Sequence, residues 1–372
     1  MPRMRGRGGA VAGDGAASGA VRKRRAASIP SSYYIMRAGR SLSAGGRRVE
    51  YGDACMLWVL AKADDGSLEV LEGLPAGVRL ARGETAEAFD GQPPPDAILV
   101  CSIGRDVVRA VLAEAPSARW IHTRSAGVEG LPLPEIAARG LVLTNGRGAF
   151  SRSLAEWAMG ALLFFAKDFR RLVRSQEAGR WEQFAPQMLA GRWVGIVGYG
   201  DIGRAVATLA GAFGMRVRAL RRSAGLPGSG PAPDEMLPPG RLAELMALSD
   251  DVVVATPLTA ETRGLVGERE IGAMKPTSVL VNVGRGAVVR EAPLVDALRR
   301  RAILGAALDV FETEPLPAGH PFYTLDNVLL SPHCADQVPG WLELAMHGFR
   351  DNLLRFLEGR PLENVVDPSR GY

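Results

Sequence analysis

The 372-residue sequence contains 47% hydrophobic and 23% charged residues, the composition of an ordinary soluble globular protein with about two domains of ~150 residues. Its longest apolar run, residues 157–166, is about half of the ~20 residues that a membrane span requires, so the composition excludes an integral membrane protein. Three widely spaced cysteines exclude a disulfide scaffold, and four histidines without paired spacing give no reason to expect a bound metal.

The net charge of +5 is unevenly distributed along the chain. Residues 1–50 carry eleven Lys and Arg against two acids, whereas the remainder carries 34 basic and 38 acidic residues. This mildly acidic body has no bulk charge with which to bind nucleic acid. The first 50 residues are rich in Arg, Ala, Gly and Ser, which is the composition of a chloroplast or mitochondrial transit peptide. The alternative is a disordered basic arm, which could bind nucleic acid, on a cytoplasmic protein.

From residue 51 onward, strand-like runs alternate with helical patterns. Before residue 180, strands are expected at residues 56–61, 97–101, 120–123 and 141–144, and helices at residues 106–115, 133–139 and 153–178. The long helix at 153–178 rests on apolar residues at helical spacing. Its first part is a candidate subunit interface, although a buried core helix has the same pattern.

The alternation becomes clearer from residue 192. Strands are expected at residues 194–197, 215–220, 251–255, 278–283, 305–310 and 327–331, and helices at 202–213, 241–248, 268–274, 292–301 and 340–358. Strands that alternate with helices of about ten residues predict a parallel, doubly wound α/β sheet. The Gly/Pro-rich residues 224–240 are expected to form a surface excursion.

A glycine-rich turn follows the strand at residues 194–197. Gly198, Gly200 and Gly203 form a G-x-G-x-x-G pattern between that strand and the next helix, which is the context that a dinucleotide site requires. The first glycine permits a tight turn, the second lets the backbone approach a pyrophosphate, and the third lets the helix pack closely on the strand. The helix N-terminus then offers unpaired N–H groups to the phosphates. The sequence therefore predicts dinucleotide binding.

The end of the following strand indicates which dinucleotide is preferred. An NAD site usually has an acid there, but this sequence has no acid from residue 202 to 233 and instead has Arg221, Arg222 and Ser223. Guanidinium groups bind phosphate in a bidentate, charge-assisted way. We therefore expect NADP(H) to be preferred to NAD(H), with a basic strand end that accepts either cofactor as the alternative.

Three further polar residues lie where strands are predicted to end. They are Arg285, Glu314 and His333. Because ligands bind at the carboxyl ends of strands in a doubly wound sheet, these residues form a plausible set for reducing a carbonyl group.

At this point the chain resembles the D-isomer-specific 2-hydroxyacid dehydrogenase family over roughly residues 55–367. The matching motifs, in chain order, are Ser125-Ala126-Gly127-Val128, Thr144-Asn145, Ala155-Glu156, Leu189-Ala190-Gly191, Pro257-Leu258-Thr259-Ala260-Glu261-Thr262, Met274-Lys275-Pro276, Asn282 to Gly286, Asp309 to Pro315, Ser331-Pro332-His333 and Pro361 to Asp367. The resemblance implies two Rossmann-like domains with doubly wound parallel sheets. The cofactor domain, residues 153–334, would be inserted into a substrate domain made of residues 51–152 and 335–372.

The resemblance also implies roles for individual residues. His333 would be the general acid, Glu314 its carboxylate partner, and Arg285 the anchor for the substrate carboxylate and carbonyl. Backbone amides of Ala126, Gly127 and Val128 would hold the other end of the carboxylate. The implied cofactor-binding residues are Gly198, Gly200, Asp201, Ile202, Gly203, Arg221, Arg222, Ser223, Thr256, Pro257 and Asp309, the last at the nicotinamide end. Cys334 and residues 335–339 depart from the usual pattern of the family, which affects the expected substrate preference.

The function implied is an NAD(P)-dependent oxidoreductase acting on a small 2-oxoacid or D-2-hydroxyacid. Glyoxylate and hydroxypyruvate are the first candidate substrates, because small 2-oxoacids need only a carboxylate clamp and a compact pocket. A phosphoglycerate dehydrogenase-like enzyme and a nucleotide-binding corepressor or scaffold of the same fold are alternatives. The family resemblance also implies a homodimer.

Overall fold

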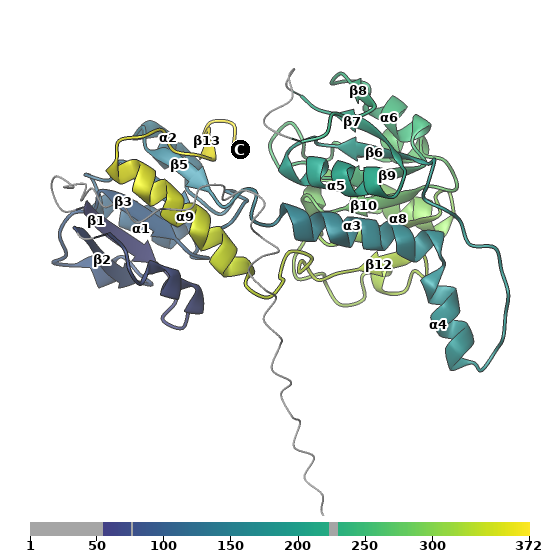
Figure 1. Ribbon diagram of the computed structural model, residues 1–372, viewed down its shortest axis with the longest axis horizontal. Coiled ribbons are helices and arrows are strands. Elements are labelled where there is room, and N and C mark those ends of the chain that lie inside the picture. The colour runs from purple at the N-terminus through teal and green to yellow at the C-terminus, as the bar shows by residue number, and fades with distance from the viewer. Residues whose placement is uncertain (1–54, 76, 223–229) are drawn as a thin grey trace, which may run out of the picture. The chain divides into compact units, whose positions relative to one another are not determined.

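The computed structural model describes residues 55–75, 77–222 and 230–372 (Figure 1). The proposed transit segment, residues 1–50, lies outside the described residues, as does Ser223. Two sheets organise the described chain, and each has helices packed against it (Figure 1).

The first sheet has six strands in the order β13-β5-β4-β3-β1-β2. Its strands are β1 (Cys55–Leu60), β2 (Val78–Gly83), β3 (Ala97–Val100), β4 (Trp120–Thr123), β5 (Val142–Asn145) and β13 (Val365–Val366). Neighbouring strands are parallel except for the antiparallel pair β13 and β5. β1, β3 and β4 are buried along their whole length, as expected for parallel strands with both faces covered.

Helices from distant parts of the chain cover the two faces of this sheet. α1 (Arg105–Glu114) and α2 (Leu133–Ala138) contribute apolar side chains to one core cluster, and α9 (Trp341–Leu357) contributes to another with β1, β3 and Trp120. Short 3₁₀ turns lie at Gly66–Leu71 and Glu87–Phe89. The chain therefore returns to the first sheet at its end, after leaving it at β5.

The second sheet has seven parallel strands in the order β12-β11-β10-β9-β6-β7-β8. Its strands are β6 (Trp193–Val197), β7 (Arg216–Leu220), β8 (Glu235–Leu237), β9 (Asp251–Val254), β10 (Val279–Asn282), β11 (Gly305–Leu308) and β12 (Val328–Leu330). The strand order reverses at β6, which lies between β7 and β9, and such a switch point is where doubly wound sheets bind ligands. The expected fold class, two doubly wound Rossmann-like units with the second inserted into the first, is confirmed.

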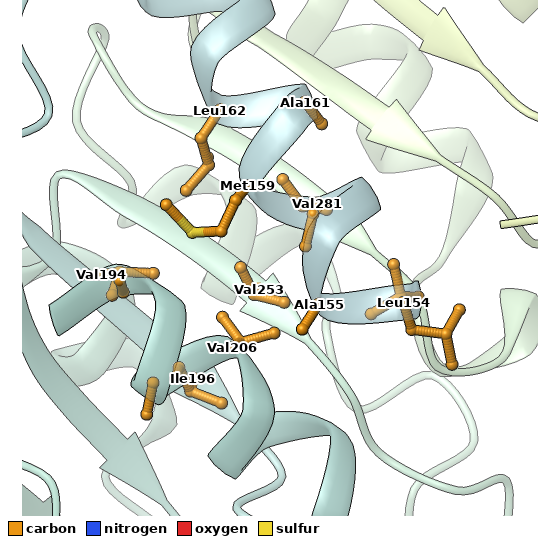
Figure 2. Packing of buried hydrophobic residues seen from close by; sticks show 14 of the residues in the cluster. Leu154, Ala155, Met159, Ala161, Leu162, Val194, Ile196, Val206, Val253 and Val281 are labelled. Carbon is orange, nitrogen blue, oxygen red and sulfur yellow. The ribbon is translucent and has the colours of Figure 1, made fainter. Parts of the chain in front are cut away.

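The second sheet is flanked by α3 (Ser151–Ala166), α5 (Asp201–Ala212), α6 (Leu242–Leu248), α7 (Glu268–Gly272) and α8 (Glu291–Arg299), with short 3₁₀ turns at Gly286–Val288 and Pro321–Tyr323. Figure 2 shows side chains of α3, among them Met159, packed with Val253 and Val281 of the strands and Val206 of α5. α3 is thus a core helix of the second sheet.

Most expected elements lie within a few residues of the observed ones. The prediction of one long helix over residues 153–178 is wrong. α3 ends at Ala166, and a separate helix, α4 (Phe169–Glu177), follows it. Asp168 breaks the helix with a left-handed backbone (φ 48°), and its carboxylate accepts a hydrogen bond from the Arg171 backbone N–H at 3.3 Å. The sequence also did not predict β2, β8 or β13. Among the described residues, no helix combines the length and apolar character needed to cross a bilayer.

Candidate active site

The glycine-rich turn links β6 to α5 at the switch point of the second sheet. Gly198 has a φ of 98°, and a Cβ there would lie 2.7 Å from the Ala255 carbonyl oxygen. A Cβ on Gly203 would lie 2.3 Å from the Gly198 carbonyl oxygen. A Cβ on Gly200, in contrast, would meet no atom within 4 Å, and Gly200 is the residue that precedes the first turn of α5. The backbone is therefore tightly packed behind the turn and open in front of it.

The first turn of α5 carries charged residues, and their pairing determines which polar groups are left for an anionic ligand. Asp201 forms ion pairs with Arg147, at 3.0 Å, and with Arg204. Arg204 Nη1 is buried and has no hydrogen-bond partner in the described part of the chain. A buried donor without an acceptor is costly unless a ligand or water satisfies it. This orphaned guanidinium nitrogen and the open backbone at Gly200 fit the pyrophosphate of a dinucleotide.

The next strand, β7, is followed directly by Arg221 and Arg222, the two arginines that we assign from the sequence to the adenosine end of the cofactor. Partial burial and the charge of Arg204 lower the pKa of Arg221. Arg222 forms an ion pair with Glu261, and its guanidinium carbon lies 4.5 Å from the ring centroid of Tyr372. Neither partner of Arg222 was predicted from the sequence.

Thr256 and Pro257 follow β9 beside the glycine-rich turn. The Thr256 hydroxyl donates to the Val197 carbonyl oxygen at 2.8 Å, and a Cβ on Gly198 would lie 2.8 Å from that hydroxyl. The Pro257 carbonyl oxygen accepts a 2.6 Å hydrogen bond from the Thr262 hydroxyl. Thr256 thus supports the turn from behind, next to the place where the sequence predicts the cofactor.

His333 and Glu314 form a hydrogen-bonded pair at the ends of the strands. Nδ1 of His333 lies 2.7 Å from Oε2 of Glu314, and Oε1 of Glu314 accepts from the Phe311 backbone N–H at 2.9 Å. His333 has a left-handed backbone (φ 53°), and 42% of its side chain is exposed. Because Glu314 engages Nδ1, Nε2 is the ring nitrogen that can face a substrate.

Asp309 fixes the loop that carries His333. Its Oδ1 accepts hydrogen bonds from the Ser331 hydroxyl at 2.6 Å and from the backbone N–H groups of Cys334 and Ala335 at 3.0 and 3.1 Å. Its backbone carbonyl accepts from the His333 N–H at 2.9 Å. The buried Asp309 side chain therefore anchors the backbone on both sides of His333. The sequence implied only a contact with the cofactor for this residue.

Arg285 lies against the loop expected to bind a substrate carboxylate. A Cβ on Gly127 would lie 2.0 Å from Arg285 Nη2, and Arg285 Nε donates to Glu129 Oε1 at 3.0 Å. Arg285 Nη1 donates to the Gly284 carbonyl oxygen at 2.8 Å. The structure thus brings Arg285 to the Ala126–Gly127–Val128 segment. Glu129 occupies a guanidinium edge that a substrate carboxylate could take, and the sequence did not single it out.

A buried ion pair supports this loop from behind. Arg124 Nη1 lies 2.6 Å from Asp65 Oδ2, and both side chains are more than nine-tenths buried. Burial raises the pKa of Asp65, but the hydrogen bonds from Ser67 and Arg124 outweigh it and lower the pKa below its usual value. The Asn145 side chain amide donates to the Ala126 carbonyl oxygen at 2.6 Å. These contacts hold the loop that starts at Ser125, although the sequence assigned neither Asp65 nor Arg124.

Asp336 introduces a further carboxylate near the pair of His333 and Glu314. Partial burial raises the pKa of Asp336, the charges of His333 and Arg285 lower it, and the charge of Asp309 raises it further. His122, in contrast, is buried in the core with its Nδ1 2.7 Å from the Thr144 hydroxyl, and burial lowers its pKa to about 3. Within the described ranges, no three His, Cys, Asp or Glu residues gather to hold a metal ion.

Comparison with known proteins places this arrangement in a family. Residues 159–335 match the model of the D-isomer specific 2-hydroxyacid dehydrogenase NAD-binding domain. A glyoxylate reductase of Thermococcus gammatolerans is 34% identical over 281 residues, which cover 72% of this chain and 82% of that protein.

Two solved structures are also similar. A D-isomer specific 2-hydroxyacid dehydrogenase of Xanthobacter autotrophicus Py2, solved with NADPH and MES, has a TM-score of 0.75 at 30% identity and covers 86% of this chain and 100% of its own. An NADPH-dependent glyoxylate/hydroxypyruvate reductase of Sinorhizobium meliloti, solved with citrate, has a TM-score of 0.69 at 29% identity, with coverage of 85% and 98%. The chain belongs to the D-isomer-specific 2-hydroxyacid dehydrogenase family.

Proposed function

We propose that the protein is an NADPH-preferring reductase that converts small 2-oxoacids into D-2-hydroxyacids, with glyoxylate and hydroxypyruvate as the first candidate substrates. The observation that carries the proposal is the 2.7 Å pair between His333 Nδ1 and Glu314 Oε2, together with Arg285 beside the Gly127 backbone. A proton donor and a carboxylate anchor are the two elements that reduction of a 2-oxoacid requires.

Each residue of this set has a distinct chemical task. Arg285 and the backbone N–H groups of Ala126, Gly127 and Val128 would bind the substrate carboxylate, with Arg285 also polarising the carbonyl group. Glu314 orients the imidazole by holding Nδ1, and Nε2 of His333 donates a proton to the carbonyl oxygen as the alkoxide charge develops. The nicotinamide cofactor supplies the hydride when it is bound.

The cofactor assignment rests on the residues around the glycine-rich turn. Gly198, Gly200 and Gly203, with the backbone of Asp201 and Ile202, would bind the pyrophosphate, and Arg221, Arg222 and Ser223 the 2′-phosphate. Thr256 and Pro257 would border the adenosine, and Asp309 the nicotinamide end. The similar structures from Xanthobacter and Sinorhizobium, one solved with NADPH and one named as NADPH-dependent, support a preference for NADP(H), and NAD(H) remains the alternative.

The two sheets divide these tasks between two domains. Residues 153–334 would form the cofactor domain, since the glycine-rich turn and the strand ends with Arg285 and Asp309 belong to the second sheet. Residues 51–152 and 335–372 would form the substrate domain. Residues 1–50 would be a transit peptide for a chloroplast or mitochondrion, with a cytoplasmic protein as the alternative.

We also infer a homodimer, but with a different interface from the helix considered first. One face of α3 packs in the core of the second sheet, and Arg152, Glu156 and Gly160 of its other face are exposed. The following segment, α4 and residues 178–192, exposes large apolar side chains: Phe169, Leu172, Val173, Trp181 and Met188. Trp181 is 93% exposed, and exposed aromatic and aliphatic side chains in one segment are typical of an interface.

The test is a panel of 2-oxoacids, including glyoxylate, hydroxypyruvate and phosphohydroxypyruvate, assayed with NADPH and with NADH. We expect turnover of the two smaller acids and loss of about 10²–10⁴ in kcat in His333→Ala, with dinucleotide binding retained. Turnover of phosphohydroxypyruvate alone would favour the phosphoglycerate dehydrogenase-like alternative. Nucleotide binding without turnover of any acid would favour the corepressor or scaffold.

A further inference from the structure

Tyr372, the last residue of the sequence, stacks on an arginine at the end of β7. The guanidinium carbon of Arg222 lies 4.5 Å from the Tyr372 ring centroid, and that of Arg370 lies 5.3 Å from the same ring. Arg222 follows a strand of the second sheet, whereas Tyr372 follows β13 of the first sheet. The contact therefore joins a residue of the expected cofactor site to the final turn of the chain.

The final turn is held in a defined conformation. The Asp367 Oδ1 accepts from the Ser369 backbone N–H at 2.9 Å and from its hydroxyl at 2.6 Å. The Asp367 carbonyl oxygen accepts from the backbone N–H groups of Arg370 and Gly371, and the Asp367 N–H donates to the Tyr372 carbonyl oxygen at 3.2 Å. The position of the Tyr372 ring is thus set by a hydrogen-bonded turn attached to β13.

The Tyr372 phenol supports a role beyond packing at the surface. Its Oη is buried and has no hydrogen-bond partner in the described part of the chain. The buried hydroxyl shows that the ring packs against the protein, and it is the ring rather than the hydroxyl that meets Arg222.

The ion pair between Arg222 and Glu261 shows which edge of the guanidinium a ligand would use. Arg222 Nη1 pairs with Glu261 Oε2, while the guanidinium carbon lies over the Tyr372 ring. Stacking on an aromatic ring leaves the N–H groups of the edge available, which is the geometry for a bidentate contact with an anion. A phosphate offers the same negative charge and acceptor oxygens as the carboxylate that now occupies this edge.

We propose that Tyr372 is a positioning residue for the cofactor, which stacks on Arg222 so that its edge faces the 2′-phosphate of NADPH, and that Glu261 occupies this edge until the phosphate replaces it. The proposal rests on the proposed function, because it assumes that Arg222 reads the 2′-phosphate. It predicts that the ring of Tyr372 contributes to NADPH binding and contributes little to NADH binding.

The experiment measures dissociation constants of the full chain for NADPH and NADH by fluorescence titration at fixed ionic strength. Tyr372→Ala is expected to weaken NADPH binding by about three- to tenfold, the range of a partly exposed cation–π contact, and to change NADH binding by less than about twofold. Tyr372→Phe keeps the ring and should bind NADPH at least half as tightly as the wild type. Arg222→Ala should weaken NADPH binding, and adding Tyr372→Ala to it should have little further effect, because the two residues act together.

Glu261→Gln provides an independent arm. Removing the competing carboxylate should strengthen NADPH binding by a few-fold and leave NADH binding almost unchanged. If Tyr372→Ala binds NADPH like the wild type while Arg222→Ala is impaired, the inference about Tyr372 is wrong and the cofactor assignment stands. If Arg222→Ala also binds NADPH normally, the assignment of Arg222 fails and the inference falls with it. Equal losses for NADPH and NADH in Tyr372→Ala would indicate a general structural role and overturn the proposal.

Discussion

Glu314 is held at both carboxylate oxygens, which makes it a sensitive position. Oε1 accepts from the Phe311 N–H and Oε2 meets Nδ1 of His333. Glu314→Gln has the same shape, but its amide nitrogen cannot accept a hydrogen bond from an Nδ1–H. The variant can therefore keep both contacts only with a His333 ring that is unprotonated at Nδ1, and it does not support the charged imidazole. We expect kcat for 2-oxoacid reduction to fall by about tenfold or more, with unchanged dinucleotide affinity, measured by steady-state kinetics and titration.

Glu312→Gln is the matched control for Glu314→Gln. Glu312 lies two residues before Glu314 in the chain. Its Oε1 accepts a hydrogen bond from the Glu291 backbone N–H at 3.0 Å and does not contact His333 in any described hydrogen bond. The control should therefore retain kcat. Equal activity of the two variants would show that Glu314 does not orient His333 during the reaction.

His122 predicts how stability responds to acid. Burial lowers its pKa from 6.5 to about 3, so between these values the unfolded chain binds a proton that the folded protein does not. At neutral pH the neutral His122 ring therefore costs the folded protein no protonation energy. Below about pH 6.5 the free energy of unfolding falls by up to ~1.4 kcal/mol per pH unit. The free energy of unfolding can be measured with urea at pH 7 and at pH 5. Its decrease between the two pH values should be about 2 kcal/mol smaller in His122→Leu than in the wild type. Equal losses in both proteins would mean that another group controls acid sensitivity.

The end of β7 should determine the choice of cofactor. Arg221 follows the strand at the position where an NAD enzyme places an acid. Arg221→Asp should repel the 2′-phosphate and offer a carboxylate to the ribose hydroxyls of NADH. A good arginine contact with phosphate is worth about 1.5–3 kcal/mol, so the ratio of kcat/KM for NADPH to that for NADH should fall by at least about tenfold. A ratio unchanged from the wild type would remove Arg221 from cofactor recognition.

The helix α4 makes the homodimer testable. Leu172 and Val173 are 45% and 51% exposed, so replacing either with Asp should cost the folded subunit little. In a dimer formed through this segment, the buried charge should shift the protein to a monomer, measured by analytical ultracentrifugation. Glu177→Gln, on the same helix, is the control. Dimers that persist in both aspartate variants would place the interface elsewhere.

Residues 1–50 should be dispensable for catalysis. The predicted catalytic and substrate-binding residues fall between residue 126 and residue 333, and the described fold begins at Cys55. A chain that lacks residues 1–50 should fold and retain kcat within about twofold, whereas these residues fused to a fluorescent reporter should direct it to an organelle. The same segment with its arginines replaced by glutamine should leave the reporter in the cytosol. A cytosolic location for the unaltered segment would support the basic-arm alternative.

Strands with continuous apolar runs, such as β1 and β3, were predicted from the sequence because burial on both faces leaves a clear pattern. The break between α3 and α4 was missed, because apolar spacing continues past it and a left-handed aspartate has no periodic signal. β2 was missed because its residues Arg79 and Arg82 are exposed, and β8 because it lies in a Gly/Pro-rich stretch.

In the candidate site, too, residues with a local sequence pattern were predicted and residues without one were not. Arg285, Glu314 and His333 were proposed as site residues because each follows a predicted strand. Glu129, which contacts Arg285, and Tyr372, which contacts Arg222, are distant in the chain from the residues they touch, and no local pattern links them. Partners of this kind follow only from the folded arrangement.

The return of the chain to its first sheet has a consequence for biosynthesis. β5 is complete at Asn145, but its neighbour β13 and the covering helix α9 come about 200 residues later. At ~5–20 residues per second, a ribosome needs roughly 10–40 s to make that interval. During this time the unpaired edge of β5 and the apolar face around Trp120 lack their native partners. The strands of the second sheet, in contrast, are contiguous from Trp193 to Leu330 and can assemble as they emerge. The N-terminal half of the nascent chain therefore leaves this strand edge and this apolar face uncovered until the last turns of α9 leave the ribosome.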